Sequence, residues 1–249
     1  MMLYSPTLAR SGGVVAGFTT RRGGVSAGPL RSLNLARRPG ETPQALAENW
    51  RRVGMALGVE GASVALCSQV HGDAVLDASA VGPGITSVGA ADALICTRPG
   101  VLVAVRVADC VPILMAAPGA VAAVHAGWRG TAARIATKAL AQLCAAAGCA
   151  PAAVVASIGP CIGPERYEVG DEVVEAMCAL VPREVAVLER EPRCHVDLQA
   201  VNRALLADAG VGQVEILRRC TASEPDHFYS HRRDGAATGR QAGVIGLCV

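Results

Sequence analysis

Two histidines and one cysteine are the residues of this 249-residue sequence that could together bind a catalytic metal ion. His71 ends a predicted strand, Cys110 stands where another predicted strand gives out, and His125 lies between a strand and a glycine-containing turn. Two imidazoles and a thiolate form a three-ligand zinc set that leaves a fourth position for water or substrate. The plainer interpretation stays open, because a cysteine in an apolar strand is usually a small buried hydrophobe and a histidine at a strand end is usually structural.

A predicted hairpin brings two of these three residues near one another. If Pro118-Gly119 forms a two-residue turn, Pro112 lies opposite His125 and Cys110 is a diagonal neighbour of His125. Diagonal cross-strand neighbours are ~7–8 Å apart at the backbone, which is within reach of one shared ion. A register slip of one residue would turn the two side chains to opposite faces. The spacing along the chain does not place His71 beside them.

The remaining histidines and one further cysteine have weaker cases. His227 and His231 have the i, i+4 spacing of a helical metal site, but Pro225 just before them disfavours a helix, so no second metal site is expected. His195 precedes a predicted helix and is interpreted as structural. Cys161 is a candidate nucleophile for which the sequence predicts no basic partner.

The elements that must position these residues alternate between strands and helices along the whole chain. We therefore predict one α/β domain over residues 1–249, a layered sandwich of mixed β-sheets flanked by helices. Helices are expected from capping and apolar spacing at 42–57, 131–147, 170–180 and 197–208. Strands are expected at 14–19, 63–70, 93–97, 101–107, 112–117, 120–126, 154–158, 213–219 and 243–249.

The composition excludes several classes of protein. The formal charge is +2, and aromatic residues make up 3%, so neither a basic surface nor a base-stacking surface for nucleic acid is expected. Apolar residues make up 51%, which excludes a mainly disordered chain. Ten cysteines are too dilute for a disulfide scaffold and no secretory signal is visible, so a cytoplasmic protein is expected. The uncharged stretch 110–128 contains Pro118-Gly119 and is predicted to form two buried strands rather than a membrane span.

Six segments resemble the laccase-domain family, also called the multi-copper polyphenol oxidoreductase or YfiH-type family and now described as purine nucleoside phosphorylases. The resemblance runs from about Gly17 to the C-terminus, and the HAGWRGT and ADCVP segments are its most specific parts. The segments are SQVHGD, ADCVPILM, VHAGWRGT, IGPCIGPERYEVG, HVDLQAVN and FYSHRRDGAATGRQAGVI. One departure is that the family often carries further cysteines before Tyr-Glu-Val-Gly, where this chain has Glu165-Arg166.

The resemblance implies a function and a set of site residues. It implies a catalytic Zn²⁺ held by His71, Cys110 and His125, in a layered α/β fold. It implies phosphorolysis of adenosine, inosine and methylthioadenosine, together with deamination of adenosine. The expected partners are therefore purine nucleosides and phosphate. Zinc in such a site can activate water for attack on C6 of adenine.

A phosphate site is predicted directly after His125. Arg129, Gly130 and Thr131 open a predicted helix there, and exposed amides at a helix start together with an arginine favour an anion. A tight strand–helix turn is the plainer interpretation of the same residues. Arginines near the two ends of the chain are further candidate anion contacts: Arg21, Arg22, Arg232, Arg233 and Arg240.

The group that protonates the leaving base stays open. Asp73, Asp92 and Asp109 are carboxylates close to the predicted ligands in the sequence. Each could instead form a turn or orient a ligand histidine.

Three other functions compete with this prediction. A copper polyphenol oxidase is disfavoured because no His-x-His pair occurs, so copper is less expected than zinc. A cysteine hydrolase would use Cys110 as nucleophile and His125 as base, as the resemblance implies for a family member that edits a cell-wall (peptidoglycan) precursor. A zinc-stabilised binding module would need a fourth protein ligand.

Overall fold

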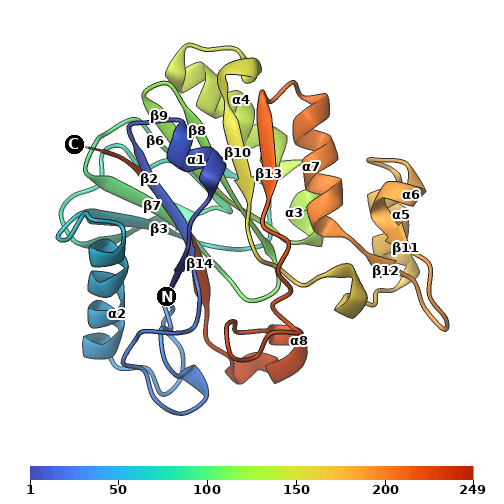
Figure 1. Ribbon diagram of the computed structural model, residues 1–249, viewed down its shortest axis with the longest axis horizontal. Coiled ribbons are helices and arrows are strands. Elements are labelled where there is room, and N and C mark those ends of the chain that lie inside the picture. Colours follow the sequence, from blue (N-terminus) through green and yellow to red (C-terminus); the bar gives the residue numbers. More distant parts are fainter. Residues whose placement is uncertain (249) are drawn as a thin grey trace.

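Two six-stranded mixed sheets form the middle of the molecule and helices cover their outer faces (Figure 1). The computed structural model describes residues 1–248, so Val249, the last residue of the predicted final strand, lies outside the described residues. Helix α2 (Pro43–Ala56) covers one sheet, and α4 (Ile135–Ala147) and α7 (Leu198–Asp208) cover the other. The predicted layered α/β fold with mixed sheets is confirmed.

The first sheet has the strand order β1-β2-β14-β7-β3-β5. Strand β14 pairs antiparallel with both β2 and β7, whereas β3 pairs parallel with β7 and β5. The bounds are β1 Met2–Leu3, β2 Val14–Thr19, β3 Ser63–Ser68, β5 Ile85–Ala90, β7 Val101–Val107 and β14 Gln241–Leu247.

The second sheet has the strand order β13-β10-β8-β9-β6-β4. Its centre is the predicted hairpin, in which Pro112 faces His125 in the register that the sequence predicts. The bounds are β4 Val75–Asp77, β6 Ala93–Cys96, β8 Val111–Ala117, β9 Ala120–Ala126, β10 Val155–Ile158 and β13 Gln213–Ile216. A separate small sheet pairs β11 Val187–Leu188 with β12 His195–Val196.

The shorter helices lie mostly around the rim of the sheets (Figure 1). The α-helices are α1 Pro6–Arg10, α3 Trp128–Ala132, α5 Asp171–Cys178, α6 Arg183–Ala186 and α8 His231–Asp234. The 3-10 helices are Gly28–Leu30, Pro151–Ala153, Pro164–Arg166 and Gly235–Ala237.

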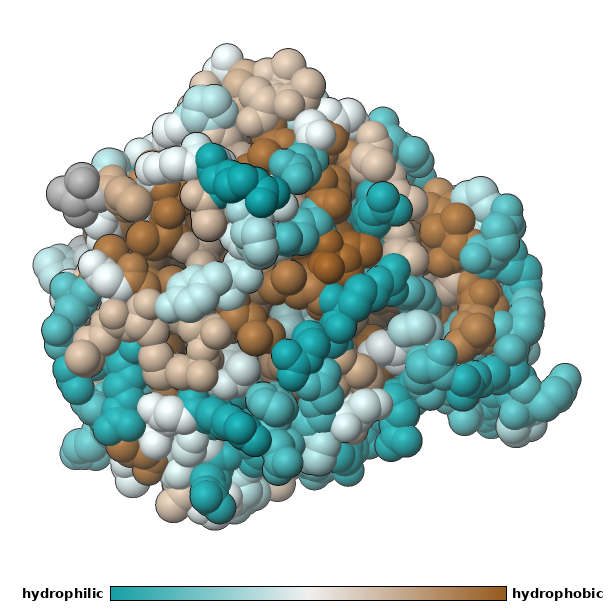
Figure 2. All heavy atoms as spheres, viewed as in Figure 1, coloured by the Kyte–Doolittle hydropathy of each residue, from teal (hydrophilic) through white to brown (hydrophobic). Residues whose placement is uncertain are grey.

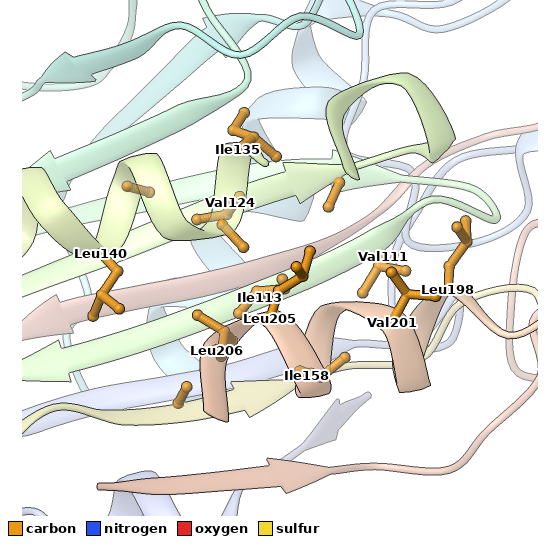
Figure 3. Packing of buried hydrophobic residues seen from close by; sticks show 14 of the residues in the cluster. Val111, Ile113, Val124, Ile135, Leu140, Ile158, Leu198, Val201, Leu205 and Leu206 are labelled. Carbon is orange, nitrogen blue, oxygen red and sulfur yellow. The ribbon is translucent and has the colours of Figure 1, made fainter. Parts of the chain in front are cut away.

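The central strands are apolar at almost every position because both of their faces are covered. Along β8, Ile113 and Met115 pack toward α4 and α7, whereas Leu114 and Ala116 pack toward the first sheet. Figure 3 shows the outer cluster, in which Ile113 lies beside side chains of α7 such as Leu205. Burial of each such aliphatic side chain contributes about 1.5–3 kcal/mol to the free energy of folding.

The helix predicted over 131–147 is wrong in its first turn. The chain forms α3, breaks at Arg134, and restarts as α4 at Ile135. Arg134 has a φ of 57°, in the left-handed region that ends a right-handed helix. The break lets Ile135, Ala139 and Leu143 pack on the second sheet while α3 stays at the end of β9. Alanine-rich helix propensity carries no information about this packing.

Other predicted helix starts are confirmed by their caps. The Thr42 side chain accepts a hydrogen bond from the amide of Ala45, and the Asp197 carboxylate accepts one from the amide of Ala200. Each such cap contributes about 1 kcal/mol to helix stability. Among residues 1–248, no helix combines the length and the apolarity that a membrane crossing requires. Figure 2 shows apolar residues over the middle of one face and hydrophilic residues along its lower and right edges.

Candidate metal centre

The three predicted ligands meet at the end of the molecule where the chain passes from one sheet to the other. His71 follows β3 of the first sheet, and His125 lies in β9 of the second. Cys110 lies in the short crossover between β7 of the first sheet and β8 of the second. The structure therefore brings together the pair that the hairpin register predicts and the histidine that spacing alone could not place.

The donor atoms of these residues are close enough to share one metal ion. The two imidazoles and the thiol offer ligand atoms that all lie within 4.8 Å of one another. Cys110 Sγ lies 3.9 Å from His71 Nε2, and the two imidazole rings meet edge to face with centroids 4.9 Å apart. A tetrahedral zinc site needs donor atoms about 3.3–3.6 Å apart, so modest side-chain rotations would close the set. His125 is buried, Cys110 is half-buried and His71 is exposed, which leaves one side of the group open.

A buried carboxylate connects the two histidines. Asp92 Oδ1 lies 2.7 Å from Nδ1 of His125, which leaves the Nε2 atom of that ring free for a metal. Asp92 also accepts hydrogen bonds from the backbone amides of Val70, His71 and Gly72. These bonds hold His71 at a φ of 60°, a conformation that is rare for residues other than glycine. Burial alone raises the pKa of Asp92, but His125 and the amides outweigh it and lower that pKa.

The electrostatics favour a thiolate next to an imidazolium when no metal is bound. Burial opposes ionisation of Cys110, but the His125 and His71 imidazoles outweigh it and lower the pKa of the thiol. Burial likewise opposes the charge on His125, but the Cys110 thiolate and the Asp92 carboxylate outweigh it and raise the pKa of the imidazole. A thiolate is the form of cysteine that binds metals and attacks electrophiles.

The open side of the group faces a cavity of about 500 Å³ that is rich in arginine. Among residues 1–248, Asp109 is the one carboxylate that lines this cavity. It already accepts hydrogen bonds from the Thr221 hydroxyl and the backbone amide of Arg232. Burial and the neighbouring Arg38 guanidinium lower the pKa of Arg240. Nε of Arg38 is buried and has no hydrogen-bond partner in the part of the chain that the structure describes. Five arginines line the cavity: Arg37, Arg38, Arg106, Arg232 and Arg240.

Of the arginines predicted to contact an anion, Arg232 and Arg240 line this cavity and others lie elsewhere. Arg21 stacks on the Tyr229 ring at 4.5 Å and donates to the carbonyl oxygens of Arg31 and Pro225. Arg22 donates to the carbonyl oxygen of Asp226.

Arg233 and the α3 residues Arg129, Gly130 and Thr131 likewise lie outside the cavity lining. Arg233 pairs with Asp234 and donates to backbone carbonyl oxygens of the segment before α8. Arg129 stacks on the Trp128 ring at 4.3 Å. The Thr131 hydroxyl is buried and accepts a hydrogen bond from Asn202. Gly130 is tightly packed, because an added Cβ would lie 3.1 Å from the carbonyl oxygen of Gly72.

The other predicted candidates separate in space. His231 lines the cavity, whereas His227 lies beside Glu224, and the segment 226–230 is not helical. Asp73 pairs with Lys138 on the surface. His195 contacts the carbonyl oxygen of Pro164, and Cys161 is buried with its thiol donating to the carbonyl oxygen of Ile162.

Sequence reasoning missed several residues of the cavity. Arg37 and Arg38 lie in the loop before α2, and Arg106 lies in β7, so no common motif connects them. Tyr167 also lines the cavity, with the Arg232 guanidinium 5.2 Å from its ring centre. Arg106 stands two residues before the ADCVPILM segment, which is a signal that could have found it, whereas Arg37 and Arg38 lie far from all six segments.

A group of side chains that could hold a metal ion, at the wall of a cationic cavity on a layered α/β scaffold, is typical of a metal-dependent enzyme that acts on an anionic small molecule. Residues 15–248 match the family model described as multi-copper polyphenol oxidoreductase laccase, and the chain belongs to this family.

Several named proteins are similar to this chain over nearly their full length. A protein of Deinococcus radiodurans named purine nucleoside phosphorylase is 46% identical, covering 99% of this chain and 92% of the relative. The purine nucleoside phosphorylase YfiH of Escherichia coli is 38% identical, covering 98% of each. The crystal structure of YlmD from Geobacillus stearothermophilus superposes with a TM-score of 0.90 at 36% identity, covering 98% of this chain and 94% of that one.

Proposed function

We propose that this protein is a zinc-dependent purine nucleoside phosphorylase that acts on adenosine, inosine and methylthioadenosine and also deaminates adenosine. One observation carries the proposal: the His71, Cys110 and His125 group opens into a cavity lined by five arginines. The relatives' name, purine nucleoside phosphorylase, supports the phosphorolysis part of this proposal.

The donor set fits a divalent ion of borderline softness. Two imidazole nitrogens and one thiolate are zinc ligands, and the open side of the group leaves a position free. A bound zinc ion would supply positive charge and Lewis acidity next to the cavity. Asp92 fixes His125 with Nδ1 engaged, so that the other ring nitrogen is available as a ligand.

The arginines provide the positive charge and the hydrogen-bond donors that phosphorolysis requires around the attacking phosphate. An oxygen of phosphate attacks C1′ of the ribose, the C1′–N9 bond breaks, and its electron pair leaves with the purine, which then takes a proton. Guanidiniums of Arg38, Arg106 and Arg240 neutralise and orient the phosphate anion, since no free carboxylate among residues 1–248 competes for them in this cavity. The products are ribose 1-phosphate and the free base.

Deamination of adenosine uses the same cavity with water in place of phosphate. Oxygen from water forms a bond to C6 of adenine, the bond from C6 to the amino nitrogen breaks, and ammonia and inosine are released. His231 lines the cavity outside the proposed ligand set, so its imidazole is available to exchange protons with these groups.

The test combines metal analysis with product analysis on purified protein. Adenosine and phosphate are supplied to zinc-loaded protein, and adenine, ribose 1-phosphate and inosine are measured. We expect Cys110→Ala to lose zinc retention and all turnover together. Cys67→Ala is the matched control, because Cys67 is a buried cysteine of β3 outside the cavity lining. Full turnover in Cys110→Ala would remove the site from the reaction.

A cysteine hydrolase is the second candidate, and the order of three side chains favours it. The Cys110 thiol, the His125 imidazole and the Asp92 carboxylate follow one another, as nucleophile, base and orienting acid do in such enzymes. A chelator distinguishes the two candidates. Loss of turnover on chelation, restored by zinc, supports the metal site, whereas turnover of a peptidoglycan-precursor dipeptide by metal-free protein supports the hydrolase.

We also propose a cytoplasmic location. All ten cysteines are free, which supports a reducing compartment.

A further inference from the structure

A second cavity lies beside the arginine-lined one, between helix α2 and the outer face of the first sheet. Its volume is about 700 Å³, and we call it the α2 groove. The helix contributes Leu46 and Trp50, and strands β3 and β5 contribute Leu66 and Ile85. The other lining residues are Leu35, Arg37, Glu41, Thr42, Pro43, Ala47, Ser68, Ser87 and Arg106.

The groove is apolar in its middle because of the strand alternation. Leu66 of β3 is the register partner of Ser87 of β5, and Val64 is the partner of Ile85. Leu66 and Trp50 belong to the core cluster under α2, while Ile85 remains 46% exposed. A large apolar side chain this exposed beside a cavity gains free energy if a ligand covers it.

The indole of Trp50 adds an unsatisfied polar group to the groove wall. Trp50 is 3% exposed, and its Nε1 has no hydrogen-bond partner among residues 1–248. A buried N–H without an acceptor costs about 1–3 kcal/mol.

Two arginines close the groove on the side of the candidate metal centre. Arg37 and Arg106 line both cavities. The Arg106 guanidinium donates to the carbonyl oxygen of Cys67, and neither arginine forms an ion pair within residues 1–248. The carboxylate of Glu41 is already occupied by Ser26, Asn34 and the amide of Thr42. The groove therefore combines an apolar floor with two guanidiniums against one carboxylate, a net positive charge in its lining.

We propose that the α2 groove binds an amphipathic anion, a small molecule with one carboxylate or phosphate group and an apolar body. The anionic group contacts Arg37 and Arg106, and the apolar body covers Leu46, Leu66 and Ile85. Because the two arginines also face the first cavity, an anion in the groove and phosphate in the first cavity weaken each other's binding. The binding of the amphipathic anion itself does not depend on the proposed phosphorylase activity.

Trp50 provides the signal for a direct test. The chain has two tryptophans, so Trp128→Phe leaves Trp50 as the single indole fluorophore. Decanoate is titrated below its micellar concentration, with 1-decanol as the uncharged probe. We expect a saturable change in Trp50 emission with decanoate, and binding of decanol about tenfold weaker or more, since it lacks the charge-assisted bonds. Calorimetry on the wild-type protein repeats both titrations without the substitution.

A matched pair of variants locates the site. Ile85→Glu places a negative charge in the groove, and Met55→Glu places the same charge on α2 at a residue of similar exposure outside the groove lining. We expect Ile85→Glu to weaken decanoate binding at least tenfold, Met55→Glu to change it less than twofold, and both to keep zinc uptake.

Three outcomes would overturn the proposal. They are absence of saturable decanoate binding, equal binding of decanoate and decanol, and equal effects of the two glutamate variants. Retention of zinc and of adenosine phosphorolysis in protein without decanoate binding would reject the groove site alone. Failure of phosphorolysis with intact decanoate binding would reject the proposed function alone.

Discussion

Asp92 and His125 form a buried pair in which the carboxylate Oδ1 lies 2.7 Å from the imidazole Nδ1. The same carboxylate accepts the backbone amides of the segment that carries His71. Asp92, the residue before β6, thus fixes two candidate ligands. They are His125 in a strand of the second sheet and His71 after a strand of the first sheet.

Substitution Asp92→Asn is expected to weaken zinc binding about 10–100-fold, because the orientation of both histidines is lost. Unfolding of the metal-free variant should also require about 1–3 kcal/mol less, since an amide cannot accept all four hydrogen bonds. Chelator competition and denaturant unfolding measure the two effects. Asp73→Asn is the control, because Asp73 is exposed and pairs with Lys138. Wild-type zinc affinity in Asp92→Asn would contradict this role.

Gly127→Ala tests the space around the ligands. An added Cβ would lie 3.1 Å from Cys110 Sγ and 3.2 Å from His71 Cδ2, so both side chains must shift away from the new methyl group. The φ of Gly127 is −73°, so alanine causes no backbone strain there. We expect a loss of zinc affinity with little change in the free energy of unfolding. Gly82→Ala, where an added Cβ meets open space, should leave zinc affinity as it is.

Arg240→Gln tests the cationic cavity. We expect the KM for phosphate to rise about tenfold or more with a smaller change in kcat, because a charge-assisted contact to phosphate is lost. Arg21→Gln should leave the KM for phosphate within about twofold, since the Arg21 side chain is engaged by Tyr229 and backbone carbonyl oxygens. Initial rates at varied phosphate measure both. An equal rise in the two variants would place Arg21 at the anion as well.

The pair of Glu224 and Arg219 predicts how stability depends on pH. Hydrogen bonding to Arg219 lowers the pKa of Glu224 below its ordinary value of 4.5, against the opposing effect of partial burial. A lowered folded-state pKa gives stability that is fully present above the unfolded pKa and is lost as pH falls through the folded pKa. Arg219→Gln should therefore lose stability near neutral pH and show a flatter decline below pH 4.5.

Denaturant unfolding between about pH 3 and 7 checks this pH dependence. Arg10→Gln is the control, because Arg10 is exposed and forms no ion pair in the described chain. A profile for Arg219→Gln that parallels the wild type would show that the pair does not carry the effect.

The hairpin, and with it half of the candidate site, follows from the local amino-acid sequence. A two-residue Pro-Gly turn between two apolar runs fixes which residues face each other, so the pairing of Pro112 with His125 followed from counting. Local capping rules likewise placed the starts of α2 and α7. These features depend on neighbours within a few residues, which is the range over which sequence patterns carry information.

Which distant segments meet depends on the packing of the folded chain. His71 reaches the hairpin because the ends of two different sheets lie together, and Arg134 breaks a helix because two segments must pack in different directions. The arginines of the cavity come from a loop, a strand and the C-terminal segment, and no local spacing relates them. Contacts of this kind depend on the packing of the whole core. The strand ends of the two sheets meet because the sheets bury their faces against each other and against helices.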